Sequence, residues 1–124
     1  MESIIFDEKH YIAFVLTDKC REKLLSLRKP EYEHVLLHHI TIAYGYEQWE
    51  IPRIQEVLDS RPIVKIFGYY LGEGVEAYRA KINDKVDRPV NSVYHLTISH
   101  DDQHTTNDAN KLVTGQYPLI WSRH

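Results

Sequence analysis

The chain has 124 residues, of which 43% are hydrophobic, 27% are charged and 11% are aromatic. This length and composition predict one folded domain over residues 1–124 and exclude a long disordered chain. Fifteen basic against eighteen acidic residues give a net charge of -3, which does not favour long nucleic acids or anionic membranes as partners. The single cysteine, Cys20, excludes an internal disulfide and a zinc ribbon.

The N-terminus lacks the features of an export signal. It carries Glu2, Asp7 and Glu8, where a secretory signal has basic residues followed by an apolar run. No stretch of eighteen consecutive apolar residues occurs in the sequence. We therefore expect a cytoplasmic protein, in the host cytoplasm if it is viral, that does not associate with membranes.

The first half of the sequence alternates strand-like and helix-like segments. Residues 10–16 form a β-prone run. Over residues 18–28, Cys20, Leu24 and Leu27 have the spacing of one apolar helix face. A long strand is expected over residues 35–44, and the Pro52 region predicts a short helix that ends at Arg61 and Pro62.

The second half adds a hairpin, another strand and a shorter helix. Residues 63–71 and 75–82 are two β-prone runs joined by a Gly-Glu-Gly turn. A strand is expected over residues 93–99, a helix over 105–113 and a last strand over 117–121. This order predicts an α+β fold with helices packed on one face of a sheet.

Two of the predicted strands carry the same tetrapeptide pattern: His39-Ile40-Thr41-Ile42 and His95-Leu96-Thr97-Ile98. Because side chains alternate along a strand, each histidine shares a face with its threonine, and the aliphatic residues point the opposite way. A third His-x-Thr sequence, at His104, has no aliphatic neighbours and is predicted to lie in a loop. The next residues on the polar faces, Ala43 and Ser99, are small and leave space beside the imidazoles.

Two imidazoles and two hydroxyls suit phosphodiester chemistry. With an ordinary pKa near 6.5, one histidine can accept a proton from an attacking hydroxyl or water while the other donates a proton to a leaving oxygen. Threonine hydroxyls can donate hydrogen bonds to the non-bridging phosphate oxygens. We call His39, Thr41, His95 and Thr97 the His/Thr tetrad.

The two tetrapeptides resemble the signature of the two-histidine (2H) phosphoesterase superfamily, the LigT-like cyclic phosphodiesterases. The resemblance implies two pseudo-symmetric β-sheet lobes with helices packed outside and a central cleft to which each lobe contributes one motif. It also implies metal-independent catalysis without a cofactor, with the His/Thr tetrad as catalytic residues. The implied substrates are 2′,3′-cyclic phosphates, 2′-5′ linkages or the cyclic oligonucleotide signals of anti-phage defence, which phage members degrade. The oligomeric state is left open.

Substrate recognition would need cationic and aromatic side chains in addition to the tetrad. Arg79 and Lys81 share one face of the strand at 75–82 and could reach a phosphate, or could form a solvated face. The candidates for stacking on a base are Tyr11, Trp49, Tyr69 and Tyr70. By alternation, His38 points away from His39 and is expected to be structural.

The sequence also allows two other functions. One is a metal-dependent hydrolase that uses His100, Asp101, Asp102 and His104, whose imidazole and carboxylate groups suit Zn²⁺ or Mn²⁺. His34 and His38 are excluded as a chelating pair, because residues i and i+4 of a strand lie about 13 Å apart. The other alternative is a non-catalytic nucleotide- or RNA-binding module that uses the sheet as a platform.

Overall fold

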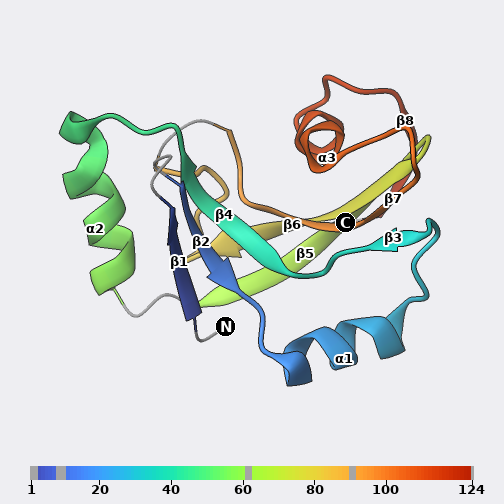
Figure 1. Cartoon of the computed structure of the whole chain (residues 1–124), viewed down its shortest axis with the longest axis horizontal. Coiled ribbons are helices and arrows are strands. Elements are labelled where there is room, and N and C mark those ends of the chain that lie inside the picture. Colours follow the sequence, from blue (N-terminus) through green and yellow to red (C-terminus); the bar gives the residue numbers. More distant parts are fainter. Residues whose placement is uncertain (1–2, 8–10, 61–62, 90–91, 124) are drawn as a thin grey trace.

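In a computed structural model, which describes residues 3–7, 11–60, 63–89 and 92–123, strands and helices form a single α+β assembly (Figure 1). The elements in chain order are β1 (Ser3–Asp7), β2 (Tyr11–Val15), α1 (Asp18–Leu27), β3 (His34–Val35), β4 (His39–Tyr44), the 3-10 turn η1 (Gln48–Glu50), α2 (Ile51–Asp59), β5 (Val64–Gly72), β6 (Val75–Ile82), β7 (His95–His100), α3 (Thr106–Val113) and β8 (Leu119–Arg123).

The strands form one antiparallel sheet in the order β1-β2-β4-β7-β6-β5-β8, with β3 paired to β7 beside this path. The predicted α+β class is confirmed. Within the described ranges the sheet is continuous and no separate second lobe is present. None of the helices in these ranges combines the length and apolar character that crossing a bilayer requires.

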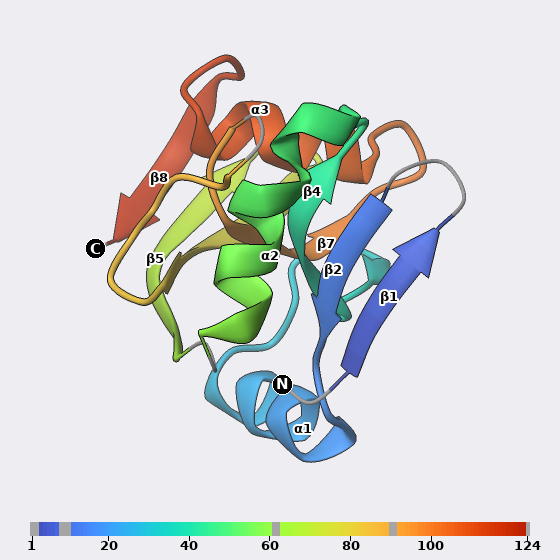
Figure 2. The same ribbon diagram turned by 90° about the vertical axis from the view of Figure 1, so that its left-hand side faces the viewer.

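The helices cover both faces of the sheet, so the prediction that they share one face was wrong. α1 and α2 pack on the main core, which contains Ile40, Leu96 and Ile98, whereas α3 packs on a smaller cluster that contains Ala77. Tyr78 belongs to the main core, and neighbouring residues of a strand point to opposite faces. α1 and α3 accordingly lie on opposite sides of the strands (Figures 1 and 2).

Helix α1 begins as the sequence predicts and ends differently. The Thr17 hydroxyl caps it by accepting a hydrogen bond from the Cys20 amide at 3.1 Å. Cys20, Leu24 and Leu25 pack against the core, but Leu27 is 71% exposed. Leu27 is the last residue of the helix, and the chain becomes extended at Arg28, so the predicted apolar face stops one turn early.

The strand predicted over residues 35–44 is interrupted just before the first histidine motif. Leu37 has a φ of +49°, in the left-handed region, and this separates β3 from β4. The amides of Leu36 and Leu37 still donate to the Ile98 and Thr97 carbonyls of β7, at 2.8 and 3.0 Å. The interruption is therefore a bulge that keeps β3 and β4 alongside the same strand.

A buried carboxylate ties the far end of β7 to β6 and to the chain before β3. Glu76 is fully buried and accepts hydrogen bonds from the Tyr69 hydroxyl (2.5 Å), the Ser99 hydroxyl (2.6 Å) and the Glu31 amide (2.8 Å). Ser99 also accepts from the Tyr32 amide at 3.1 Å. The register shifts between Glu76 and Ala77, so Ser99 joins this network instead of lying beside the imidazoles as alternation predicted.

Substitution of Glu76 is expected to destabilise the fold strongly. Glu76→Ala leaves two buried hydroxyl donors and the part-buried Glu31 amide without their acceptor and should lower the free energy of unfolding by about 3 kcal/mol or more. Glu76→Gln, which keeps one acceptor oxygen, should cost less. Urea denaturation measures both, with exposed Glu73→Ala in the same hairpin as the matched control. Equal stability of Glu76→Ala and Glu73→Ala would contradict this account of the network.

Candidate functional site

The central strands β4 and β7 bring the two histidine motifs together. They pair antiparallel with Ile40 opposite Leu96. Extending this register by one residue in each direction places His39 next to Thr97 and Thr41 next to His95. Ile40, Ile42, Leu96 and Ile98 are buried in the main core, so the His/Thr tetrad occupies the opposite face. The sheet thus gathers all four predicted catalytic residues around one local two-fold axis.

The tetrad is only partly open to solvent. His39, Thr41 and His95 are half-buried, and Thr97 is 8% exposed. Val15 and Ala13 of β2 pair with His39 and Thr41, and Ala77 of β6 pairs with Thr97. These neighbouring side chains are apolar, so they solvate a charge on the tetrad poorly.

Burial and neighbouring positive charge lower the pKa of both imidazoles. The pKa of His95 falls to about 4, mainly because burial disfavours its cation, with further lowering by Arg88 and His39. A hydrogen bond with the Val93 backbone opposes this effect. The pKa of His39 is lowered by burial and by His38. Both rings are therefore neutral at pH 7 in the unliganded protein, and a bound anion would raise both pKa values.

His38 contacts His39, which alternation along the strand did not predict. Its Nδ1 lies 3.1 Å from Nδ1 of His39, and the rings meet edge to face with centroids 5.3 Å apart. The bulge at Leu37 causes this departure. One of the two nitrogens must donate and the other accept, so this contact engages Nδ1 of His39 and leaves its Nε2 for proton exchange.

Arg79 lies on β6, the strand that pairs with the second motif strand, β7. It is the cross-strand partner of His95, and its Nε is buried without a hydrogen-bond partner among the described residues. The guanidinium carbon lies 5.5 Å from the centroid of the Phe67 ring, and Lys81 Nζ lies 4.9 Å from the same centroid. Both cations therefore lie on the tetrad's face of β6, and an unpaired buried guanidinium nitrogen suits an anionic ligand.

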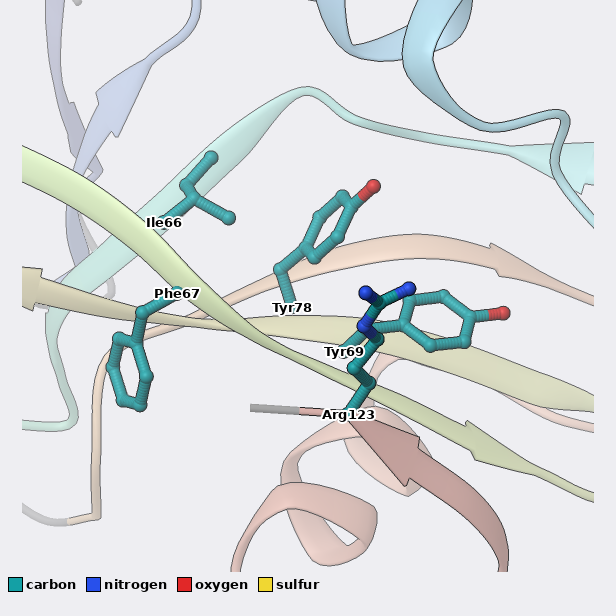
Figure 3. Close-up of a pocket in the computed structure, with 5 residues that line it drawn as sticks. All are labelled: Ile66, Phe67, Tyr69, Tyr78 and Arg123. Atoms are coloured by element: carbon teal, nitrogen blue, oxygen red, sulfur yellow. The ribbon is translucent and has the colours of Figure 1, made fainter.

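Phe67 lies on this face because it alternates with the core residue Ile66, and a second bulge occurs at this position. The register between β5 and β6 shifts between Ile66 and Gly68, which leaves Phe67 as the extra residue. In Figure 3, Phe67 points to the opposite side of β5 from Ile66 and Tyr78. The pocket drawn there has a volume of about 210 Å³ and also includes Tyr69 and Arg123.

A second pocket, of about 380 Å³, lies between α2 and the segment before β7, and its lining includes Arg53, Lys85, Arg88 and Tyr94. Neither of these two pockets is lined by a member of the tetrad. Arg88 connects the second pocket to the tetrad electrostatically, because its charge lowers the pKa of His95. No local pattern indicates a role for Arg88, which precedes His95 by a stretch of irregular chain.

Two of the four aromatic candidates, Tyr69 and Tyr70, are buried. Tyr69 is buried in the main core, where it donates to Glu76, and Tyr70 is buried in the cluster under α3, so both are packing residues. Their burial overturns the prediction that they stack on a base. Trp49 is 67% exposed on η1, after β4. The Tyr11 side chain lies outside the described residues, although its backbone pairs with Tyr44.

The predicted metal residues pair in different directions. His104 Nδ1 lies 2.6 Å from Asp101 Oδ1, and His100 Nδ1 donates to the Asp101 carbonyl at 2.7 Å. Asp102 instead pairs with Nε2 of His34. Within the described ranges, His100, Asp101, Asp102 and His104 therefore do not form a common set of metal ligands. No protein-family model, curated protein or solved structure matches the chain.

The lowered pKa of His95 predicts a loss of stability in acid. The His95 ring takes up a proton below pH 6.5 in the unfolded chain but only near pH 4 in the folded chain. The contribution of neutral His95 to the free energy of unfolding is therefore complete above pH 6.5 and is lost as the pH falls to about 4. The difference amounts to at most about 3 kcal/mol. NMR titration of the ring and urea denaturation of wild type and His95→Gln measure it. A pKa for His95 at or above 6.5 would contradict the electrostatic description.

Proposed function

We propose that the chain is a metal-independent phosphodiesterase that hydrolyses a cyclic nucleotide or cyclic oligonucleotide phosphodiester by two-histidine acid–base catalysis. The observation that carries this proposal is the pairing of Ile40 with Leu96, which sets each motif's histidine beside the other motif's threonine. A single phosphoryl group between them would meet one imidazole and one hydroxyl from each side. This is the arrangement that concerted proton transfer to and from a phosphodiester requires.

The two lobes implied by the resemblance correspond, in this proposal, to the two halves of one sheet. β4, which pairs with β2, carries the first motif, and β7, which pairs with β6, carries the second. The local two-fold axis passes between β4 and β7, near Ile40 and Leu96. The catalytic face would therefore lie across the middle of the sheet, between the strands of the two halves.

His95 is the better general base. Its pKa of about 4 keeps it neutral over the physiological range, and its contact with the Val93 backbone engages one ring nitrogen and leaves the lone pair on the other. His95 accepts a proton from water as the water oxygen attacks phosphorus. The bond from phosphorus to the leaving oxygen breaks, and His39 donates a proton to that oxygen. The two histidines then exchange a proton with solvent and regain their starting states.

The remaining groups neutralise charge on the phosphate. Thr41 and Thr97 donate hydrogen bonds to its non-bridging oxygens, where negative charge develops in the transition state. Arg79, whose Nε lacks a partner among the described residues, can pair with the same group from the neighbouring strand. The anion in turn raises the pKa of His39, which loads the acid with its proton. Lys81 lies farther along β6, where it suits a second phosphate.

The proposal predicts a large loss of turnover when either histidine is removed. The assay uses excess chelator with 2′,3′-cyclic mononucleotides, 2′-5′ oligoadenylate and cyclic di- and trinucleotides, and resolves the products. His39→Ala and His95→Ala should each lower kcat/KM by roughly a hundredfold or more, and Thr41→Ala and Thr97→Ala by less. His104→Ala and Thr114→Ala, on the α3 side of the chain, serve as matched controls.

The outcomes separate the alternatives. Near-normal turnover in both histidine variants would refute the mechanism. Binding of a nucleotide without turnover of any substrate would favour the non-catalytic binding module, and turnover that chelator abolishes would favour a metal-dependent hydrolase. If His95 is the base, kcat/KM of the wild type increases with pH around pH 4, where His95 loses its proton. As the pH rises further, kcat/KM decreases again when His39 loses its proton, and the midpoint of this decrease lies below pH 6.5.

A further inference from the structure

A cluster of imidazole and carboxylate groups lies at the end of β7 away from His95. It joins the start of β3 to the turn between β7 and α3. His34 and His100 are cross-strand partners, and their ring centroids lie 5.2 Å apart. Nε2 of His34 contacts Oδ1 of Asp102. This cluster is separate from the His/Thr tetrad, because His100 follows His95 by five strand residues, about 16 Å.

Three residues of this cluster present metal-ligating atoms to one point. One carboxylate oxygen each of Glu33 and Asp102 and one ring nitrogen of His34 lie within 4.8 Å of one another. In a tetrahedral Zn²⁺ site with bonds near 2.1 Å, ligand atoms lie about 3.4 Å apart. All three side chains are exposed, so small rotamer changes can close this difference.

The charges in the cluster favour a cation. One carboxylate oxygen of Glu33 lies within 4.8 Å of one of Asp102, and the negative charge of Asp101 acts on Asp102 as well. Like charges at such a separation repel unless a proton or a cation lies between them. The imidazole of His34 distinguishes this site from one for Ca²⁺ or Mg²⁺, which bind oxygen ligands.

The turn that carries Asp102 is held in place by its neighbours. The Asp101 amide donates to the Gly74 carbonyl at 2.9 Å, and Asp101 Oδ1 accepts from the Gln103 amide at 3.0 Å. A Cβ atom at Gly74 would lie 2.2 Å from His104 Nδ1, so only glycine lets the turn approach this closely. The backbone at Asp102 therefore has a defined position opposite His34 before any ion binds, which lowers the cost of ordering a ligand set.

We propose that Glu33, His34 and Asp102 bind a divalent transition-metal ion of the Zn²⁺ class, with solvent completing the coordination. The ion would link β3 to the turn before α3 and so stabilise the pairing of β3 with β7, the strand that carries the second histidine motif. The proposal does not rest on the proposed phosphodiesterase activity, and the ion takes no part in that reaction.

Calorimetric titration of ZnCl₂ into the chelator-treated, desalted full chain tests the proposal, and heating scans give the melting temperature with and without zinc. The wild type should bind one Zn²⁺ per chain at this site and melt at a higher temperature when zinc is present. His34→Gln and Asp102→Asn should each weaken binding at least tenfold and abolish the melting shift. Asp84→Asn, an exposed carboxylate paired with Lys65 at 3.7 Å, is the matched control and should bind as wild type does.

A second measurement locates the ion. Zinc should shift the ring resonances of His34 in NMR spectra with the same stoichiometry as the calorimetric titration. Zinc binding that is unchanged in both His34→Gln and Asp102→Asn would overturn the proposal, because the ion would then be held by other histidines. Absence of binding by the wild type would also overturn it.

Discussion

The structure depends on the antiparallel pairing of β4 with β7 through Ile40 and Leu96. These two residues are fully buried, and the hydrophobic effect that buries them fixes which way the alternate side chains point. A slip of one residue in either strand would bury the histidine and threonine of that motif and expose its aliphatic residues. The same energy that forms the core therefore holds four polar groups together on the opposite face.

Irregularities on either side of this pair adjust the site. The bulge at Leu37 brings His38 against His39, and a second bulge occurs at Phe67, whose ring lies close to Arg79 and Lys81. The register shift at Glu76 turns the end of β7 toward a buried carboxylate that binds three donors. The regular part of each strand thus places the catalytic candidates, and the irregular parts decide which groups surround them.

Periodicity and capping were sufficient to predict most of the regular elements, although the strand β1 was not predicted. The β5–β6 hairpin, the α1 helix with its Thr17 cap and the two motif strands follow from local patterns that tertiary contacts reinforce. The alternation of His39 with Ile40 and of His95 with Leu96 also predicted which side chains share a face. These parts of the candidate site were accessible because they depend on local geometry alone.

The remainder required information that the sequence does not carry locally. A positive φ at Leu37 has no residue signal, because the bulge is imposed by pairing with β7. The position of α3 on the face opposite α1 depends on chain connectivity. The burial of Tyr69 depends on its hydrogen bond to Glu76, seven residues away. The proximity of Arg88 to His95 and of Glu33 to Asp102 likewise arises only when distant segments pack together.

The lowered pKa values of His39 and His95, and an Arg79 Nε that has no hydrogen-bond partner in the described part of the chain, favour an anion at this face, since an anion offsets the cost of protonating either imidazole. In the proposed mechanism, His39 and His95 contact the same phosphoryl group. NMR titration of the chain with inorganic phosphate tests this claim most directly. The account predicts that the ring resonances of His39 and His95 shift together, with one common half-saturation concentration and a rise in both pKa values. A shift of only one ring, or different half-saturation concentrations for the two, would contradict it.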